Sequence, residues 1–171
     1  GMSNLSDIKK AYNFLIKKKK ILKEKITLLH CVSEYPTKSS NINLASIVYL
    51  KNIFDCSIGF SDHTTDLLAS KSAISLGASI IERHFTLNKR MEGPDHMLSS
   101  EKNEIASLVK FKDFHNKFNL WFKKKSKIEK EQITLLLGDG IKKIQPNEYL
   151  TINSQKKSLY AKKNINKDEK F

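Results

Sequence analysis

Three short groups of polar side chains each follow an apolar run of this sequence. The groups are Ser33-Glu34-Tyr35, Ser61-Asp62-His63 and Glu82-Arg83-His84. His63 and His84 lie 21 positions apart, which corresponds to about one strand-and-helix repeat. Two neutral imidazoles with a carboxylate nearby are common ligands of a divalent transition metal. The pair therefore predicts a metal site, against the alternative that each histidine is only structural.

Further ionisable groups near the pair are candidates to complete or orient such a site. They are Asp62, Glu82, Asp95 and His96. Imidazole with carboxylate and water suits Mn, Fe, Co or Zn, and these residue types do not choose among them.

Two of the polar groups contain residues with two interpretations. Glu82 and Arg83 are neighbours along an expected strand, so their side chains face opposite sides and only one points into the site. For each, an ion pair that braces the strand end and a direct contact with substrate both remain open. Tyr35 either contacts a substrate or covers the core with its ring.

The elements that must position these groups follow the hydrophobic pattern. Strands are predicted at 26–32, 56–60 and 78–81, and helices at 3–19, 43–54, 66–76 and 100–122. Strands that alternate with helices through short connections predict right-handed βαβ units and a parallel sheet, which is an α/β fold. Because the carboxyl ends of parallel strands share one edge, the three polar groups should meet there.

The last third of the chain has a different pattern. The basic stretch Lys123 to Lys130 and the turn-rich "LGDGIKKIQPNE" predict a connector rather than core. The final "KSLYAKKNINKDEKF" predicts a short strand and polar turn of a small β unit. We therefore divide the chain into residues 1–122, a linker at 123–153, and the start of a second domain at 154–171.

Composition excludes several classes of protein. The chain has 171 residues and a formal charge of +13, but its only arginines are Arg83 and Arg90. Arginine is the residue favoured for phosphate and base contacts, so a lysine excess argues against nucleic-acid binding. Cys31 and Cys56 have no CxxC spacing, which indicates reduced, buried thiols. No apolar run approaches the ~18 residues of a membrane span, so we expect a cytoplasmic protein without a membrane partner.

Several segments together resemble a known enzyme family. "LLHCVSEYPT", "IGFSDHT", "GASIIERHFTLNK" and "EGPDHMLS" are similar to the second half of the catalytic barrel of the N-acetylneuraminate (sialic acid) synthase family. That family includes the legionaminic and pseudaminic acid synthases. "LGDGIKKIQPNE" and "KSLYAKKNINKDEKF" resemble its linker and the first strands of its C-terminal antifreeze-like (SAF) domain. There, Asp168 replaces a usual turn glycine, a change that Asp tolerates.

The resemblance implies the condensation of phosphoenolpyruvate with an N-acetylmannosamine-type sugar, which gives a nine-carbon 2-keto acid and phosphate. It implies a divalent metal, Mn with Mg or Co as alternatives, that polarises the sugar aldehyde. Position by position, it implies that His63 and His84 bind the metal and act in catalysis. It also implies that Ser61 and Glu34 lie near phosphoenolpyruvate and that Tyr35 and Asp95 contact the sugar. Because Glu82 and Arg83 stand beside His84, we further expect Glu82 to act in catalysis and Arg83, as a strand-end cation, to bind substrate. Lysine replaces Arg83 in some members, which suggests that charge matters more than guanidinium shape.

The resemblance covers only part of the family's fold. A (β/α)8 barrel needs about 250 residues, and this chain matches about strands six to eight. We therefore expect a fragment with little activity alone and a homodimer in the full-length form. The alternatives are another phosphoenolpyruvate-condensing aldolase, or an inactive βαβ module that binds a sugar phosphate or pairs with another chain.

Overall fold

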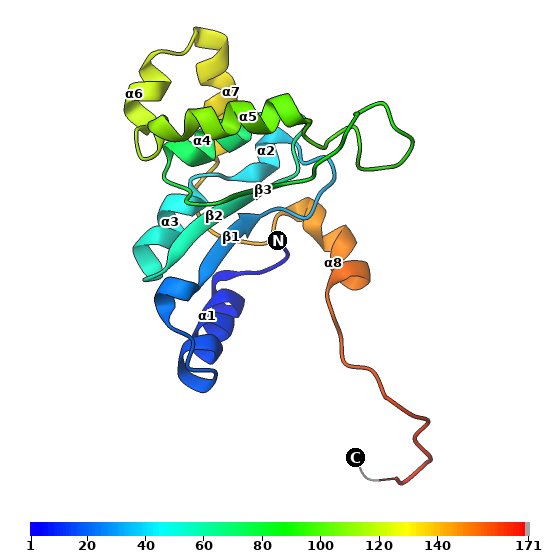
Figure 1. Cartoon of the computed structure of the whole chain (residues 1–171). Coiled ribbons are helices and arrows are strands. Elements are labelled where there is room, and N and C mark those ends of the chain that lie inside the picture. Colours follow the sequence, from blue (N-terminus) through cyan, green and yellow to red (C-terminus); the bar gives the residue numbers. More distant parts are fainter. Residues whose placement is uncertain (170–171) are drawn as a thin grey trace.

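A three-stranded parallel sheet forms the centre of the protein. The computed structural model describes residues 1–169, and the sheet has the order β1-β2-β3, with β1 at Thr27–Cys31, β2 at Ser57–Asp62 and β3 at Ile81–Arg83 (Figure 1). Cys31 is the partner of Ser61 in the first pair, and Ser61 is the partner of Glu82 in the second. The α/β fold and the parallel sheet predicted from the pattern are confirmed.

Helices and short helical turns connect the strands and follow them. They are α1 (Leu5–Asn13) with a π-helical turn (Phe14–Lys18), a 3-10 turn (Lys23–Lys25), α2 (Ser39–Ile42), α3 (Ser46–Ile53), α4 (Leu68–Ser75), α5 (Lys102–Lys110) with a 3-10 turn (Phe111–Phe114), α6 (Phe118–Lys123), α7 (Lys127–Leu137), a 3-10 turn (Pro146–Glu148) and α8 (Tyr149–Gln155). No helix within residues 1–169 is both long and apolar enough to cross a membrane.

The core lies between one face of the sheet and the helices α3 and α4, which pack against β2. Side chains alternate along a strand, so Ile58 and Phe60 enter this core while Gly59 and Ser61 face the other way. Burying an aliphatic or aromatic side chain of this size stabilises the fold by about 1.5–3 kcal/mol. The strands are therefore held by the helix-covered face, and the opposite face is left for polar groups.

The single helix predicted over 100–122 is broken into α5, a 3-10 turn and α6. Asn116 stands at the break with a φ of 59°, a left-handed conformation that ends a right-handed helix. The rings of Phe111 and Trp121 meet edge to face across the break at 5.7 Å. The apolar residues that predicted one helix therefore belong to two shorter helices, and their aromatic side chains pack on one another across the break.

The linker predicted over 123–153 contains a helix, α7, that contributes two side chains to the core. α7 begins at a capping box formed by Ser126 and Glu129. It buries Ile133 and Leu136, and Leu136 belongs to the same apolar cluster as the strands. The backbone N–H of Leu44 also donates to the carbonyl of Leu136 at 2.8 Å. The sequence pattern did not identify the run "ITLLL" as part of the core, because the residues that it packs against lie about ninety positions earlier in the chain.

The predicted strand near the C-terminus does not form in the described part of the segment. Residues 156–169 contain no strand, and residues 170–171 of the expected β unit lie outside the described residues. Leu159 and Tyr160 are almost fully exposed, so no surface is present on which a strand would be buried. Asp168 does adopt a φ of 68°, the conformation in which glycine is usual. The assignment of this segment to a second domain stays a prediction.

Candidate functional site

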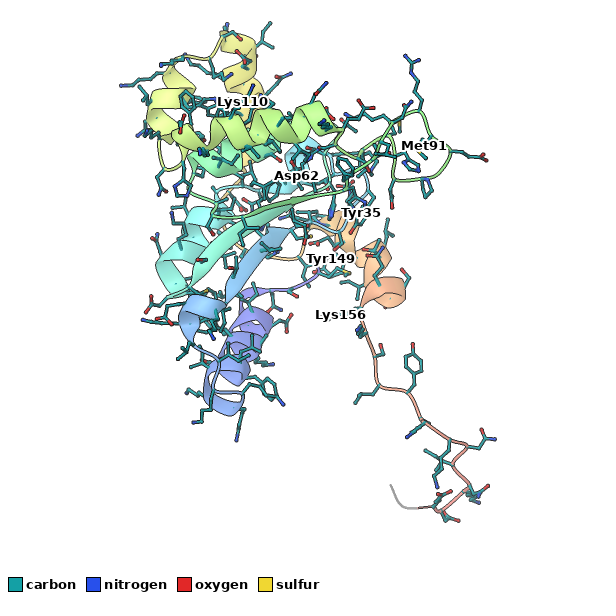
Figure 2. All side chains as sticks on the ribbon, viewed as in Figure 1. Tyr35, Asp62, Met91, Lys110, Tyr149 and Lys156 are labelled. Carbon is teal, nitrogen blue, oxygen red and sulfur yellow. The ribbon has the colours of Figure 1, made fainter. Side chains whose placement is uncertain are left out.

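The three polar groups meet at the carboxyl edge of the sheet, as expected. The ring of Tyr35 lies 4.1 Å from that of His63 and 5.9 Å from that of His84, measured between ring centroids. The two imidazoles are 5.6 Å apart and nearly perpendicular. Tyr35, which is labelled in Figure 2, remains 43% exposed. We call these three side chains the ring cluster.

His63 is held in a defined orientation. It is buried, and its Nδ1 lies 2.9 Å from the carbonyl oxygen of Val32. A carbonyl can only accept, so Nδ1 carries the proton and the lone pair of the neutral ring resides on Nε2. A backbone carbonyl that fixes the tautomer in this way is the usual partner of a metal-binding histidine.

Cys31 is a neighbour of His63 that the sequence did not single out. Burial would raise the pKa of the Cys31 thiol, but its hydrogen bond with His63 contributes to a net lowering. Burial would likewise lower the pKa of His63, but the hydrogen bonds with Cys31 and Val32 raise it. Cys31 and Cys56 are both free and only half buried, which corrects the expectation of buried core thiols. The register with Ser61 is the signal that places Cys31 on the site face.

Glu82 points toward the ring cluster. Its Oε1 accepts a hydrogen bond from the Ser61 hydroxyl at 2.7 Å, across the β2–β3 pair. A cavity of about 280 Å³ is lined by Ser61, His63, Glu82, Arg83 and His84. A hydroxyl, a carboxylate and two imidazoles therefore converge on one small space.

Arg83 points to the opposite face and forms the ion pair that was one of its two interpretations, while a contact with substrate stays a prediction. Its side chain is 2% exposed and forms an ion pair with Asp62, whose side chain is fully buried. The alternation of the strand decides this outcome, because the Ser61 side of β2 receives Glu82 and the Asp62 side receives Arg83.

Asp95 and His96 lie on the long loop that follows β3. An Asp95 carboxylate oxygen is 3.8 Å from Nδ1 of His84, and both side chains are partly exposed. The Nδ1 of His96 is 2.7 Å from the Thr86 hydroxyl, within the same loop. Asp95 therefore lies at the ring cluster, whereas His96 makes its hydrogen bond within the loop.

Glu34 is engaged in bracing its own loop. Its carboxylate accepts hydrogen bonds from the Lys38 N–H at 3.3 Å, the Asn41 side chain at 3.0 Å and the Asn147 side chain at 2.6 Å. Its expected place beside phosphoenolpyruvate stays a prediction, and these bonds give it a role in holding Tyr35.

A buried polar group beneath this loop was missed by sequence reasoning. Glu148 is fully buried and accepts from the backbone N–H groups of Met2 at 2.6 Å, Ser33 at 3.0 Å and Gln145 at 2.9 Å. Burial would raise the pKa of Glu148, but these three donors and the cation of Lys142 lower it. Burial lowers the pKa of Lys142 itself. The only local signal was the capping pattern of "QPNE".

The residues present could hold a metal ion with two histidine ligands, which would leave its other coordination positions open. Within residues 1–169 no set of three or more His, Cys, Asp or Glu side chains is arranged to hold a metal ion. His63 has the tautomer that a ligand requires, and His84 is its neighbour. The remaining coordination positions would have to come from water or substrate oxygens, as in catalytic metal sites.

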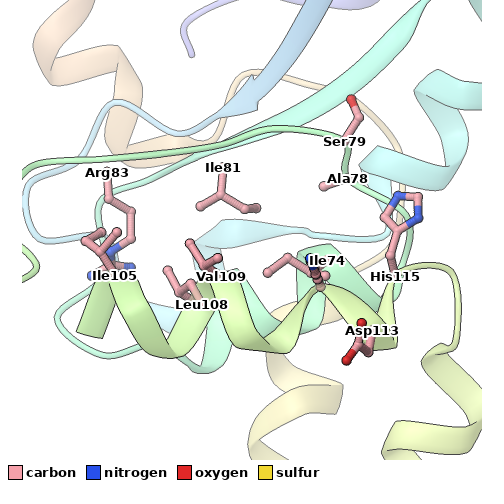
Figure 3. A pocket seen from close by; sticks show the side chains of 11 residues that line it. Ile74, Ala78, Ser79, Ile81, Arg83, Ile105, Leu108, Val109, Asp113 and His115 are labelled. Carbon is pink, nitrogen blue, oxygen red and sulfur yellow. The ribbon is translucent and has the colours of Figure 1, made fainter. Parts of the chain in front are cut away.

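A larger cavity, of about 830 Å³, lies elsewhere. Figure 3 shows it between β3 and α5, where Ile81, Ile105, Leu108 and Val109 line it with apolar side chains. Its lining lacks the rings of the cluster, and Arg83 is its only residue shared with the smaller cavity. The candidate site is the smaller cavity, because its lining includes both histidines of the ring cluster.

The sequence of this chain is similar to those of known synthases. A model of the NeuB family matches residues 1–117. The N,N'-diacetyllegionaminic acid synthase of Campylobacter jejuni is 41% identical over 171 residues, which is 100% of this chain and 46% of that protein. The pseudaminic acid synthase of Helicobacter pylori is 37% identical over 144 residues, or 84% of this chain and 37% of that protein.

A solved structure matches as well. The spore coat polysaccharide biosynthesis protein spsE of Bacillus subtilis aligns with a TM-score of 0.72 at 28% identity, over 90% of this chain and 41% of that one. The chain thus spans less than half the length of these relatives. Since the family match covers more than half of the chain and the identity to a named synthase extends along all of it, this protein belongs to the NeuB family.

Proposed function

We propose that this chain forms part of an enzyme that condenses phosphoenolpyruvate with an N-acetylmannosamine-type sugar. The product would be a nine-carbon 2-keto sugar acid of the sialic, legionaminic or pseudaminic type, with release of phosphate. The observation that carries the proposal is the ring cluster beside Glu82 and Asp95 at the carboxyl edge of a parallel sheet. The sheet would supply about strands six to eight of a (β/α)8 barrel, the fold in which this edge holds the active site.

His63 and His84 would hold the divalent metal, Mn with Mg or Co as alternatives. When bound, such a cation supplies electrophilic activation of the sugar aldehyde. The carbonyl of Val32 keeps His63 in the required tautomer by accepting its Nδ1 proton. Asp95 lies against His84 and, with the exposed ring of Tyr35, is placed to orient the sugar.

Ser61 and Glu82 would act on the phosphoenolpyruvate side. The Ser61 hydroxyl donates to Glu82, which leaves the second carboxylate oxygen available to accept a proton. After the carbon–carbon bond forms, water must add to the cationic carbon of the former enol phosphate and lose a proton. Glu82 is the carboxylate on the cavity wall that could take this proton.

The test joins this chain to the preceding barrel half of the C. jejuni relative and measures phosphate release from phosphoenolpyruvate with N-acetylated hexoses. Activity is expected with at least one such sugar. His63→Ala and His84→Ala should each lower kcat/KM by about 10²–10⁴-fold, because metal activation is worth several kcal/mol. A folded chimera with both histidines that releases no phosphate with any of the sugars would reject the proposal.

A further inference from the structure

We infer that Arg83 is a positioning residue that fixes the two histidines and the Asp95 loop relative to one another from the covered face of the sheet. The metal part of this inference rests on the proposed function, whereas the part that concerns the loop stands on the structure alone. The sequence left Arg83 open between an ion pair at the strand end and a contact with substrate, and neither interpretation included the histidine pair or the loop.

All three nitrogens of the guanidinium are used. Nε donates to the Ser100 hydroxyl at 2.7 Å, Nη1 pairs with Asp62, and Nη2 donates to the Thr64 carbonyl at 2.8 Å. Weaker contacts at 3.4 Å reach the hydroxyl of Ser70 in α4 and the carbonyl of Leu98. One buried side chain thus joins the end of β2, helix α4 and the end of the loop that follows β3.

The ion pair sets the separation of the two imidazoles. Asp62 immediately precedes His63, Arg83 immediately precedes His84, and Asp62 and Arg83 are partners in the β2–β3 register. Asp62 is further fixed by the Thr64 N–H at 2.8 Å. Because adjacent residues of a strand face opposite sides, clamping the first pair on the covered face holds the histidines on the site face.

The contact with Ser100 closes the loop of residues 85–99. The Ser100 N–H donates to the carbonyl of His84 at 2.7 Å, and the Thr86 N–H donates to the carbonyl of Ser100 at 3.0 Å. Both ends of the loop are therefore pinned where Arg83 binds the Ser100 hydroxyl. Asp95, which must reach His84, lies between these pinned ends.

An arginine and a lysine at position 83 differ in which of these contacts they can make. A lysine at position 83 retains the charge opposite Asp62, but a single ammonium cannot serve Asp62, the Thr64 carbonyl and Ser100 together. Arg83→Lys should therefore preserve the histidine pair and release the loop. Arg83→Met removes the charge as well and should disturb both.

Two measurements on the 171-residue chain separate these effects. Mn²⁺ binding by electron paramagnetic resonance reports on the histidine pair. Limited proteolysis with a glutamate-specific protease reports on the loop through cleavage after Glu92, which is exposed in its middle. Cleavage after Glu131, exposed on the distant helix α7, reports on general unfolding in the same digest.

We expect Arg83→Lys to keep a Mn²⁺ affinity close to wild type and to be cleaved faster at Glu92 but not at Glu131. Arg83→Met should bind Mn²⁺ about 10–100-fold more weakly, as is usual when a group that orients metal ligands is lost. Should that variant fail to fold, Asp62→Asn with Arg83→Met leaves no unpaired buried charge and serves in its place. Arg90→Lys, the same change at the other, exposed arginine, should alter neither measurement.

Wild-type cleavage rates at Glu92 in Arg83→Lys, or unchanged Mn²⁺ binding in the folded double variant, would overturn the inference. If the wild-type chain binds no Mn²⁺, the metal part of the proposed function fails instead. The cleavage at Glu92 still decides in that case whether Arg83 positions the loop.

Discussion

Glu148 shows how a single buried carboxylate supports the site without touching it. It is fully buried, and three backbone N–H groups from separate parts of the chain donate to it. One of these donors is the N–H of Ser33, and Ser33 is the first residue of the loop that carries Tyr35. Charge-assisted bonds of this kind are stronger than neutral ones, so the carboxylate form of Glu148 stabilises the fold.

Glu148→Gln should lower the free energy of unfolding at pH 7 by about 1.5–3 kcal/mol, the range for hydrogen bonds to a charged group. The folded pKa of Glu148 lies below its ordinary 4.5, so its contribution is complete above that value and is lost as pH falls through the folded pKa. Urea titrations of both proteins at pH 7 and at successively lower pH values measure this difference. A gap that stays constant below pH 4 would contradict the assignment.

His30 also makes the protein less stable in acid, beginning at a higher pH than Glu148 does. It is a buried residue of β1, its Nε2 lies 2.7 Å from the carbonyl oxygen of Ile42, and its Nδ1 has no partner within the described residues. Burial, assisted by the charge of Lys142, lowers its pKa from 6.5 to about 3. The folded protein therefore keeps this imidazole neutral in a range where the unfolded chain takes up a proton.

From pH 6.5 down toward pH 3, His30 should reduce the free energy of unfolding by about 1.4 kcal/mol per pH unit. The sign follows because the unfolded state binds the extra proton. His30→Gln keeps an amide donor for Ile42 but cannot titrate, so its unfolding free energy should vary less steeply with pH. Denaturant unfolding of both proteins across this range provides the check, and parallel pH profiles would refute the assignment.

The sequence predicted which residues reach the site better than it predicted how they are held. His63, His84 and Tyr35 stand at strand ends, which the hydrophobic pattern reveals, and the structure brings their rings together. Strand alternation also predicted that the side chains of Glu82 and Arg83 would face opposite sides of the sheet. Which of them enters the site depends on the register with β2, and a single strand does not contain that information.

At the scale of elements, the break between α5 and α6 depends on one backbone conformation. Asn116 has a φ of 59°, which Asn and Gly tolerate and β-branched residues do not. Its side chain also accepts a hydrogen bond from Lys51 at 3.1 Å, at an exposed position where such a bond adds little. The helix predicted over 100–122 missed this reversal because apolar spacing continues across it.

Asn116→Val should therefore destabilise the protein by about 1–3 kcal/mol, the cost of a strained left-handed residue. Asn116→Gly relieves that strain and should stay much closer to wild type, losing only the exposed contact with Lys51. Thermal unfolding of the two variants side by side measures the difference. Equal losses in both would mean that the side chain of Asn116, rather than its backbone, stabilises the turn.

At the scale of the whole molecule, the sheet has two strand edges without a partner among the described residues. β1 and β3 each pair only with β2. The apolar cavity of about 830 Å³ lies between α5 and β3, which is one of these two edge strands (Figure 3). Unpaired parallel edges next to apolar surface favour association with other chains.

The 171-residue chain studied alone should therefore self-associate as its concentration rises. The chimera that supplies the preceding barrel half should cover the edges and remain uniform in size. Light scattering after size-exclusion chromatography distinguishes the two behaviours. A monodisperse, monomeric 171-residue chain at high concentration would show that these edges are protected by their own side chains.

The bond between Glu148 and Ser33 spans 115 residues, and this has a consequence for how the protein is made. Synthesis proceeds from the N-terminus, so the strands and their helices leave the ribosome well before Glu148 does. Until then the Ser33 N–H lacks its acceptor and the loop that carries Tyr35 lacks its brace. The edge that carries the ring cluster is therefore completed late, by a segment that supplies none of the three rings.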